Sequence, residues 1–342
     1  MITGIAFKHK DEYQEDSWQR SMATAIRDPF ELLARLNLSQ DKFKKQLYLT
    51  NKFKLLVPLS YVGKMQKGNW DDPLLKQVLP VMDEGEEVAG FKVDPVGDLK
   101  AEISAGVLQK YQGRVLLVTT GACAVHCRYC FRRHFPYVDS LADNKNWSET
   151  LANIKADSSL SEVILSGGDP LMLSDEKLQA MCAELADIPH IKTLRFHSRV
   201  PVFIPQRINA AFLSWTKQLP VKKVMVIHAN HANELDDEVG RRLNALGAAG
   251  FTLLNQTVLL KGVNDSADAL VGLSQKLFSM NVLPYYLHQL DQVQGAAHFG
   301  VDRAVGMGLI ENLKKTLPGY LVPRYVEEIS GERCKQAIVK ID

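Results

Sequence analysis

Six short runs of aliphatic, β-branched and aromatic residues recur from residue 114 onward, and stretches with helical periodicity separate them. A typical separating stretch places apolar residues on one helical face, namely Leu178, Met181, Cys182 and Leu185. This alternation predicts βαβ units and a parallel sheet, with functional groups at the carboxyl ends of the strands. The predicted strands cover residues 115–118, 163–165, 193–196, 224–227, 252–255 and 284–287.

Six such units are too few to close an eight-fold barrel, and they predict a partial (β/α)6 barrel of the α/β class. The first hundred residues predict short helices, because Asp28-Pro29 and Asp72-Pro73 each combine an N-cap with a proline at the first helical position. Residues 81–105 are acidic and contain glycines without a clear period, so we expect an irregular link. The pattern thus divides the chain into a helical extension over residues 1–105 and a barrel from residue 106.

Composition narrows the function classes. The 342 residues carry 41 Lys and Arg against 39 Asp and Glu, a net charge of +2, so no basic field predicts direct nucleic-acid binding. No apolar run approaches the roughly 20 residues that span a bilayer. The first residues lack the apolar core of a secretory signal. We therefore expect a protein of the reducing cytoplasm that does not bind membranes.

Three of the five cysteines fall within eight residues, in the loop after the first predicted strand. Cys123, Cys127 and Cys130 form a C-x3-C-x2-C motif, which can hold three corners of a [4Fe-4S] cluster and leave the fourth iron open. The alternatives are free thiols, or zinc with His126 or His134. Because structural zinc needs four protein ligands, usually as two pairs, the spacing favours iron–sulfur.

The next predicted strand ends in Ser166-Gly167-Gly168-Asp169, where two glycines permit close backbone approach to a ligand or form a plain turn. A cysteine loop after the first strand and this segment after the second resemble the radical S-adenosylmethionine superfamily. The resemblance implies that the methionine moiety binds the open iron and that reduction yields a 5′-deoxyadenosyl radical. It also implies cofactor contacts from Ser166, Gly167, Gly168, Asp169, His228 and Gln256.

Further blocks with recognisable sequence lie along the chain, at residues 128–135, 197–201, 230–234, 255–260 and 295–299. Together they resemble the lysine 2,3-aminomutase family. The run 131–137 and the chain length are most similar to the bacterial subgroup that makes β-lysine for elongation factor P. The resemblance implies an isomerase that moves the amino group of L-lysine from C2 to C3, with an (R) product.

That family carries pyridoxal phosphate on a lysine near the C-terminus, after a glycine-containing loop. The resemblance implies that Lys335 is this Schiff-base lysine, with Lys340 as its rival, in a C-terminal segment over residues 319–342 that follows a barrel ending at 318. The loop here has one glycine where longer relatives have several. Tyr111 and Arg114 are implied near the pyridoxal phosphate, and capping the strand entrance is their alternative role.

The substrate would be held at both ends. Arg132 matches the family's carboxylate-binding arginine, and a forked guanidinium suits that group. Asp291 and Glu328 match the two acids that bind the ε-ammonium, although longer relatives have aspartate where Glu328 stands. Arg195 and Arg199 flank the third predicted strand and serve either the adenosyl carboxylate or ion pairs with acids.

The resemblance further implies a lysyl ligase of elongation factor P that takes the product, and a reductase or flavodoxin-type electron donor. A 2,3-aminomutase for glutamate or arginine is an alternative, although two acids would repel the side chain of glutamate. A zinc-stabilised binding module of the translation machinery is a second alternative, which predicts bound zinc and no pyridoxal phosphate.

Overall fold

The computed structural model describes residues 17–41, 53–138, 140–142 and 146–339, and Lys340 lies outside them. These residues form a mixed α/β fold around one ten-stranded sheet, in which the strands follow their order in the sequence. The strands are β1 (Glu102–Ser104), β2 (Val107–Leu108), β3 (Arg114–Thr120), β4 (Glu162–Gly167), β5 (Thr193–Ser198), β6 (Lys222–Ile227), β7 (Phe251–Val258), β8 (Leu283–His288), β9 (Arg324–Glu327) and β10 (Gln336–Ala337).

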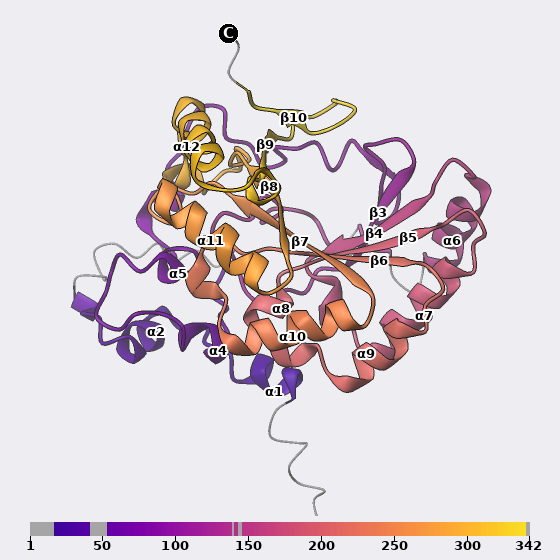
Figure 1. The fold of residues 1–342 in the computed structure, drawn as a ribbon, viewed down its shortest axis with the longest axis horizontal. Coiled ribbons are helices and arrows are strands. Elements are labelled where there is room, and N and C mark those ends of the chain that lie inside the picture. The colour runs from indigo at the N-terminus through magenta and orange to yellow at the C-terminus, as the bar shows by residue number, and fades with distance from the viewer. Residues whose placement is uncertain (1–16, 42–52, 139, 143–145, 340–342) are drawn as a thin grey trace, which may run out of the picture.

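The predicted alternation of strands and helices is confirmed from β3 to β8. Neighbouring strands from β3 to β9 pair in parallel, whereas β1, β2 and β10 add antiparallel pairs at the two edges. Crossover helices lie outside the sheet (Figure 1). They are α6 (Trp147–Ala156), α7 (Asp175–Ala186), α8 (Val200–Phe203), α9 (Ala210–Lys217), α10 (Asp237–Ala248), α11 (Ala267–Ser279) and α12 (Arg303–Thr316).

Capping side chains and buried faces explain where these helices begin and how they pack. Ser174, Asp236 and Ser266 each accept a hydrogen bond from the first turn of α7, α10 and α11, respectively. The predicted apolar face of α7 is buried against the sheet through Leu178, Met181, Cys182 and Leu185. Burial of such faces on parallel strands is the main stabilising contribution expected in this fold.

The N-terminal part contains the expected short helices. Asp28 and Asp72 cap α2 (Pro29–Arg35) and α5 (Pro73–Lys76) through hydrogen bonds to backbone amides. Lys64 donates to the carbonyls of Val202 and Glu234, which attaches this part to the crossover segments of the sheet. The remaining short elements are α1 (Trp18–Ala23), α4 (Leu59–Val62) and the 3-10 turn η1 (Met82–Gly85).

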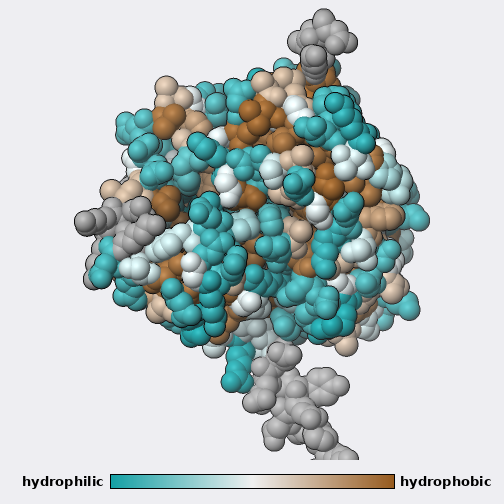
Figure 2. Space-filling model, turned by 60° about the vertical axis from the view of Figure 1, so that its left-hand side comes forward, coloured by the Kyte–Doolittle hydropathy of each residue, from teal (hydrophilic) through white to brown (hydrophobic). Residues whose placement is uncertain are grey.

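The outer surface mixes polar and apolar residues. On the face in Figure 2, hydrophilic residues are spread widely and hydrophobic residues gather mainly toward the top. Within the part of the chain that the structure describes, no helix combines the length and apolar character needed to cross a membrane.

Candidate cluster and cofactor site

The predicted site residues follow the carboxyl ends of the parallel strands. The cysteine loop follows β3, Gly168 and Asp169 follow β4, and His228 follows β6. Gln256 lies within β7, and Glu328 directly follows β9. Because parallel strands end at one edge of the sheet, side chains that are far apart in the sequence, such as Cys123 and Glu328, share this edge.

The cysteine loop carries three free, half-buried thiols. Burial and then the neighbouring Cys130 raise the pKa of Cys123, and burial first raises the pKa of Cys130 to about 11. Without a cation, these two groups stay protonated at neutral pH, and a bound metal centre would stabilise the thiolates. Three thiols with this chemistry on one loop fit the ligand set of a [4Fe-4S] cluster.

Two arginines and one glutamate fix the loop on the N-terminal part. Glu84, which is fully buried, accepts hydrogen bonds from Arg128 Nε at 2.7 Å and from Arg133 Nη2 at 2.6 Å. Both guanidinium groups also lie over the ring of Phe53, each 4.6 Å from its centroid. The backbone between the cysteines is therefore held by charged hydrogen bonds and stacking rather than by the thiols alone.

The two histidines considered for zinc make other contacts. His126 Nδ1 lies 2.7 Å from the carbonyl oxygen of Lys54, and His134 Nε2 lies 3.1 Å from that of Gln294. In the described ranges, no three His, Cys, Asp or Glu side chains are grouped closely enough to surround a single metal ion. A cubane cluster has different requirements, because each cysteine binds a different iron. These contacts favour the iron–sulfur interpretation of the motif.

The glycines after β4 pack directly against the cysteine loop. A Cβ atom on Gly168 would lie 2.3 Å from the carbonyl oxygen of Ala122, and one on Gly167 would lie 2.6 Å from that of Thr120. The amides of Gly168 and Asp169 donate to the same two carbonyls at 2.6 and 2.8 Å. In the structure, this segment supports the cysteine loop, and its predicted contacts with S-adenosylmethionine stay predictions.

The carboxylate of Asp169 joins β4 to the segment after β5. It accepts hydrogen bonds from Ser198 Oγ at 2.8 Å and from the backbone amide of Arg199 at 2.7 Å. The hydroxyl of Ser166 lies 3.1 Å from Arg132 Nη1. Of the predicted cofactor contacts, Ser166 and Asp169 therefore already have partners within the protein.

A group of histidines lines the interior beyond these residues. His228 Nε2 lies 3.0 Å from Gln256 Nε2, so the two predicted cofactor residues are adjacent. Burial first, and then Arg199 and Lys335, lower the pKa of His228 to about 3, which keeps its ring neutral. The Nε2 atoms of His197 and His288 are buried and have no hydrogen-bond partner among the described residues. Such unsatisfied atoms fit an interior that binds a polar cofactor.

The C-terminal hairpin positions Lys335. Strands β9 and β10 pair antiparallel with Gln336 opposite Glu327, and this register places Lys335 opposite Glu328. The two side chains form an ion pair. Lys335, directly before the edge strand β10, thus reaches the charged end of the interior, and its role in holding pyridoxal phosphate stays a prediction.

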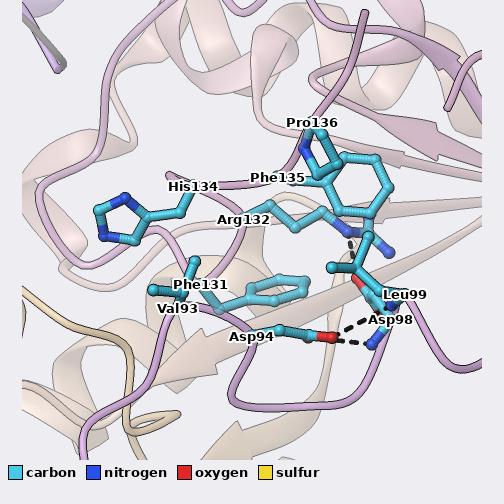
Figure 3. A pocket seen from close by; sticks show the side chains of 9 residues that line it. All are labelled: Val93, Asp94, Asp98, Leu99, Phe131, Arg132, His134, Phe135 and Pro136. Atoms are coloured by element: carbon cyan, nitrogen blue, oxygen red, sulfur yellow. Dashed lines mark hydrogen bonds and ion pairs between the residues drawn. The ribbon is translucent and has the colours of Figure 1, made fainter. Parts of the chain in front are cut away.

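The predicted ends of the substrate site are joined by an alternating series of charges. Arg132 Nε lies 2.6 Å from Asp98, and Lys110 Nζ lies 2.6 Å from the other Asp98 oxygen. Lys110 also lies 2.7 Å from Glu328, which completes the series at Lys335. The side chain of Arg132 points toward Asp98 in a small pocket lined also by Val93, Asp94, Leu99, Phe131, His134, Phe135 and Pro136 (Figure 3).

The two predicted ammonium-binding acids differ in charge state. Burial would raise the pKa of Glu328, but Lys335 and Lys110 outweigh it and lower the value to about 2. Burial and then Glu328 raise the pKa of Asp291 to about 7. Among the described residues, no side chain donates a hydrogen bond to the Asp291 carboxylate, so this acid is open to a cationic ligand.

Tyr111 and Arg114 lie beside this charged series. The Arg114 guanidinium carbon lies 5.0 Å from the centroid of the Tyr111 ring, and Glu328 raises the pKa of Tyr111 after burial. Lys110 and Tyr111 therefore adjoin the Lys335–Glu328 pair, and Arg114 lies over the Tyr111 ring. This donor set fits the phosphate of pyridoxal phosphate.

Sequence reasoning missed Asp98, Glu84 and Gln77. Asp98 and Glu84 lie in the segment predicted to be an irregular acidic link. Both side chains are buried, so water does not solvate their carboxylates. The sequence did contain a signal for these acids, namely the three arginines between residues 128 and 133. Such cations need acidic partners where they are buried, and buried acids need cations. Which acid meets which arginine could not be read from the linear sequence.

Comparison with known proteins gives the following matches. A family model described as "4Fe-4S single cluster domain" matches residues 111–195, which include the cysteine loop. Proteins named L-lysine 2,3-aminomutase from Haemophilus influenzae and Escherichia coli are each 44% identical to this chain. The match to the H. influenzae protein covers 94% of this chain and 95% of that protein. The match to the E. coli protein covers 94% of each chain. A protein of the same name from Clostridium subterminale is 32% identical over 97% of this chain and 80% of its own length.

Proposed function

The chain belongs to the L-lysine 2,3-aminomutase family, and we propose that it is an isomerase that converts L-lysine to β-lysine. The observation that carries the proposal is the convergence of the cysteine loop and Lys335 on one interior, with Arg132 and two acids between them. The required cofactors are a [4Fe-4S] cluster, S-adenosylmethionine and pyridoxal phosphate.

Cys123, Cys127 and Cys130 would hold the cluster, and Lys335 would hold pyridoxal phosphate with Tyr111 and Arg114 at its phosphate. Ser166, Gly167, Gly168, Asp169, His228 and Gln256 are the proposed contacts for S-adenosylmethionine. When bound, these groups supply the one-electron chemistry that removes hydrogen from an unactivated C–H bond. A base could not do so, because the proton on the lysine β-carbon is not acidic.

The residues of the chain orient the substrate. Arg132 would bind its α-carboxylate, and Asp291 with Glu328 would bind its ε-ammonium. Asp98 at present occupies part of the guanidinium fork of Arg132, and Lys110 occupies one oxygen of Glu328. A bound lysine would therefore compete with these internal partners, and only an amino acid with opposite charges at its two ends can replace both.

Finer features belong to the same proposal. The continuous parallel order from β3 to β8 supports a partial (β/α)6 barrel over residues 106–318. Residues 1–105 would form its helical extension, and residues 319–342 its lysine segment. We further propose a cytoplasmic enzyme with an (R) product that a lysyl ligase attaches to elongation factor P, and a reductase or flavodoxin-type electron donor. Similarity to the bacterial subgroup with this role supports these assignments.

The test is an assay of the purified protein. The protein is isolated without oxygen, reconstituted with iron and sulfide, and incubated with S-adenosylmethionine, pyridoxal phosphate, reductant and L-lysine. Chromatography and mass spectrometry should detect β-lysine, and chiral derivatisation gives its configuration. Absence of β-lysine from a protein that carries a full cluster and pyridoxal phosphate would contradict the proposal.

The same assay separates the alternatives. Glutamate or arginine as the better substrate would move the activity to another amino acid, and the ligase assay with elongation factor P tests the downstream role. Stoichiometric zinc with no iron and no pyridoxal absorbance would instead favour the binding module. We do not expect that outcome, because His126 and His134, the two histidines considered for zinc, each contact a backbone carbonyl.

A further inference from the structure

We infer that Arg199 is a positioning residue for the cluster, whose guanidinium donates a hydrogen bond to Cys127 and raises the reduction potential of a cluster bound there. Arg199 Nη1 lies 2.8 Å from Cys127 Sγ. The inference rests on the proposed function, because it requires Cys127 to be a cluster ligand. It adds a role to the ion pair with an acid that the sequence suggested for Arg199, which the structure shows with Glu234.

The guanidinium is fixed at all of its other nitrogens. Nε donates to the carbonyl of His228 at 3.0 Å, and Nη2 donates to Gln77 at 2.6 Å and to Glu234 at 2.8 Å. Gln77 comes from the N-terminal part and Glu234 from the segment after β6. Because three acceptors from these two segments hold the group, Nη1 is presented to the sulfur before any cluster binds.

Aromatic rings complete this enclosure. The Arg199 guanidinium carbon lies 4.5 Å from the ring centroid of Phe203 and 5.4 Å from that of Tyr129. Only 7% of Arg199 is exposed, so water screens its charge little. A buried charge in such a fixed position acts on its neighbours more strongly than a surface arginine would.

Other cations near the loop have different partners. Arg128 and Arg133 are paired with Glu84, and Arg132 is paired with Asp98. Within the described part of the chain, Arg199 is the only side chain that donates a hydrogen bond to one of the three sulfurs. The contact is thus a specific one rather than a general excess of positive charge.

The physical consequence follows from the chemistry of the reduction step. A low-potential one-electron donor adds one electron to the oxidised cluster, and no bond forms or breaks in that step. The added negative charge is shared with the cysteine sulfurs, so a hydrogen bond and a positive charge at Cys127 stabilise the reduced form. Hydrogen bonds to the sulfurs, net charge and solvent exposure are the determinants of cluster potential.

Redox titration of the reconstituted protein, followed by EPR of the reduced cluster, tests this inference. Arg199→Met should shift the midpoint to more negative values by at least about 59 mV, a tenfold change for a one-electron couple. Arg199→Lys keeps the charge and should shift it less. The matched control is Arg207→Met, which removes another fully buried guanidinium that bonds to Leu171 and Leu173. An Arg199→Met midpoint equal to that of the wild type would overturn the inference.

A measurement on the wild-type chain covers the case in which the variants do not fold. Protein grown with arginine labelled by ¹⁵N in the guanidinium should show ¹⁵N coupling in pulsed EPR of the reduced cluster. A reduced cluster without such coupling would overturn the role of Arg199 and leave the proposed function intact. A protein that binds no cluster after reconstitution would instead contradict the proposed function.

Discussion

The cysteine loop and the C-terminal hairpin contribute to the same interior, but the protein holds them in opposite ways. The loop is fixed by fully buried charged pairs, as in Arg128 with Glu84, and by glycine backbone packed against it. The hairpin carries Lys335 directly before the two-residue edge strand β10, and the positions around Gly331 are exposed. Substitutions in the loop should therefore change both the stability of the fold and the binding of the cluster, whereas substitutions in the hairpin should change activity with little effect on stability.

This difference has a physical reason. A metal cluster needs its ligands in place before it binds, since reorganising a loop would cost free energy at the moment of binding. A lysine that exchanges its bond to a cofactor with a substrate must instead move during each turnover. Rigid support would oppose that movement, and one ion pair to Glu328 is easily replaced.

The largest effect should come from the hairpin and should be purely chemical. Lys335→Ala should reduce β-lysine formation by at least about 10³-fold, because no other described lysine has this position. The melting temperature should stay within about 2 °C, since Lys110 still pairs with Glu328. Product assays, pyridoxal absorbance and calorimetry measure these quantities. Lys314→Ala, at an exposed position of α12, is the control that should keep full activity. A large loss of stability in Lys335→Ala would contradict the view that the hairpin affects activity and not the stability of the fold.

The next effect should come from the loop and should be structural. Glu84→Ala leaves Arg128 and Arg133 buried without their carboxylate, which we expect to cost about 3–5 kcal/mol in free energy of unfolding. Urea denaturation and iron content after reconstitution measure the two consequences. The control is Glu327→Ala in β9, whose partner Arg303 is 61% exposed, and which should cost less than about 1 kcal/mol. Equal costs would remove the contrast between the two regions.

A pair of glycine substitutions sharpens the comparison. Gly168→Ala would place a Cβ atom 2.3 Å from a backbone oxygen of the loop, so the loop must shift, at about 1–3 kcal/mol and with reduced iron binding. Gly331→Ala meets no atom within 4 Å, and only its positive φ of 91° opposes it, at about 1 kcal/mol. Iron content should fall in the first variant alone. Normal iron binding in Gly168→Ala would show that the loop is more adaptable than its packing indicates.

The smallest effect concerns pH. With a pKa of about 7, Asp291 is protonated and neutral below this value and charged above it. The kcat/KM for lysine should therefore rise by about tenfold as pH increases through 7, because only the carboxylate pairs with the ε-ammonium. Asp291→Asn should have a low kcat/KM without this step. A step that persists in Asp291→Asn would assign the titration to another group.

The strands could be predicted from the sequence where their residues are buried on both faces. Segments such as 163–165 are continuous apolar runs, and all six predicted strands exist. Strands β9 and β10 were not predicted. Arg324–Glu327 has a charged residue at each end, Gln336–Ala337 is only two residues long, and both depend on pairing with their neighbours in the sheet. Their existence is a tertiary property rather than a local preference.

The candidate site likewise contains residues that the sequence predicts and partners that only the fold reveals. Cys123, Cys127 and Cys130 are recognisable because one loop holds them all, and Lys335 because of its resemblance to a family segment. The pairing of Arg132 with Asp98 and of Lys110 with Glu328 joins residues 34 and 218 positions apart. No sequence period encodes such distances, so these partners emerged only with the fold.

The antiparallel register of β9 and β10 has a consequence for the length of the turn between them. The residues between Glu328 and Lys335 are exposed, so one or two inserted residues would lengthen the turn and leave the pairing of the two strands unchanged. A slip of one residue in the register of the strands would instead turn Lys335 to the opposite side, away from Glu328. The position of the amine therefore depends on the strand register rather than on the length of the turn, and a slipped register would abolish the reaction while every functional side chain remained present.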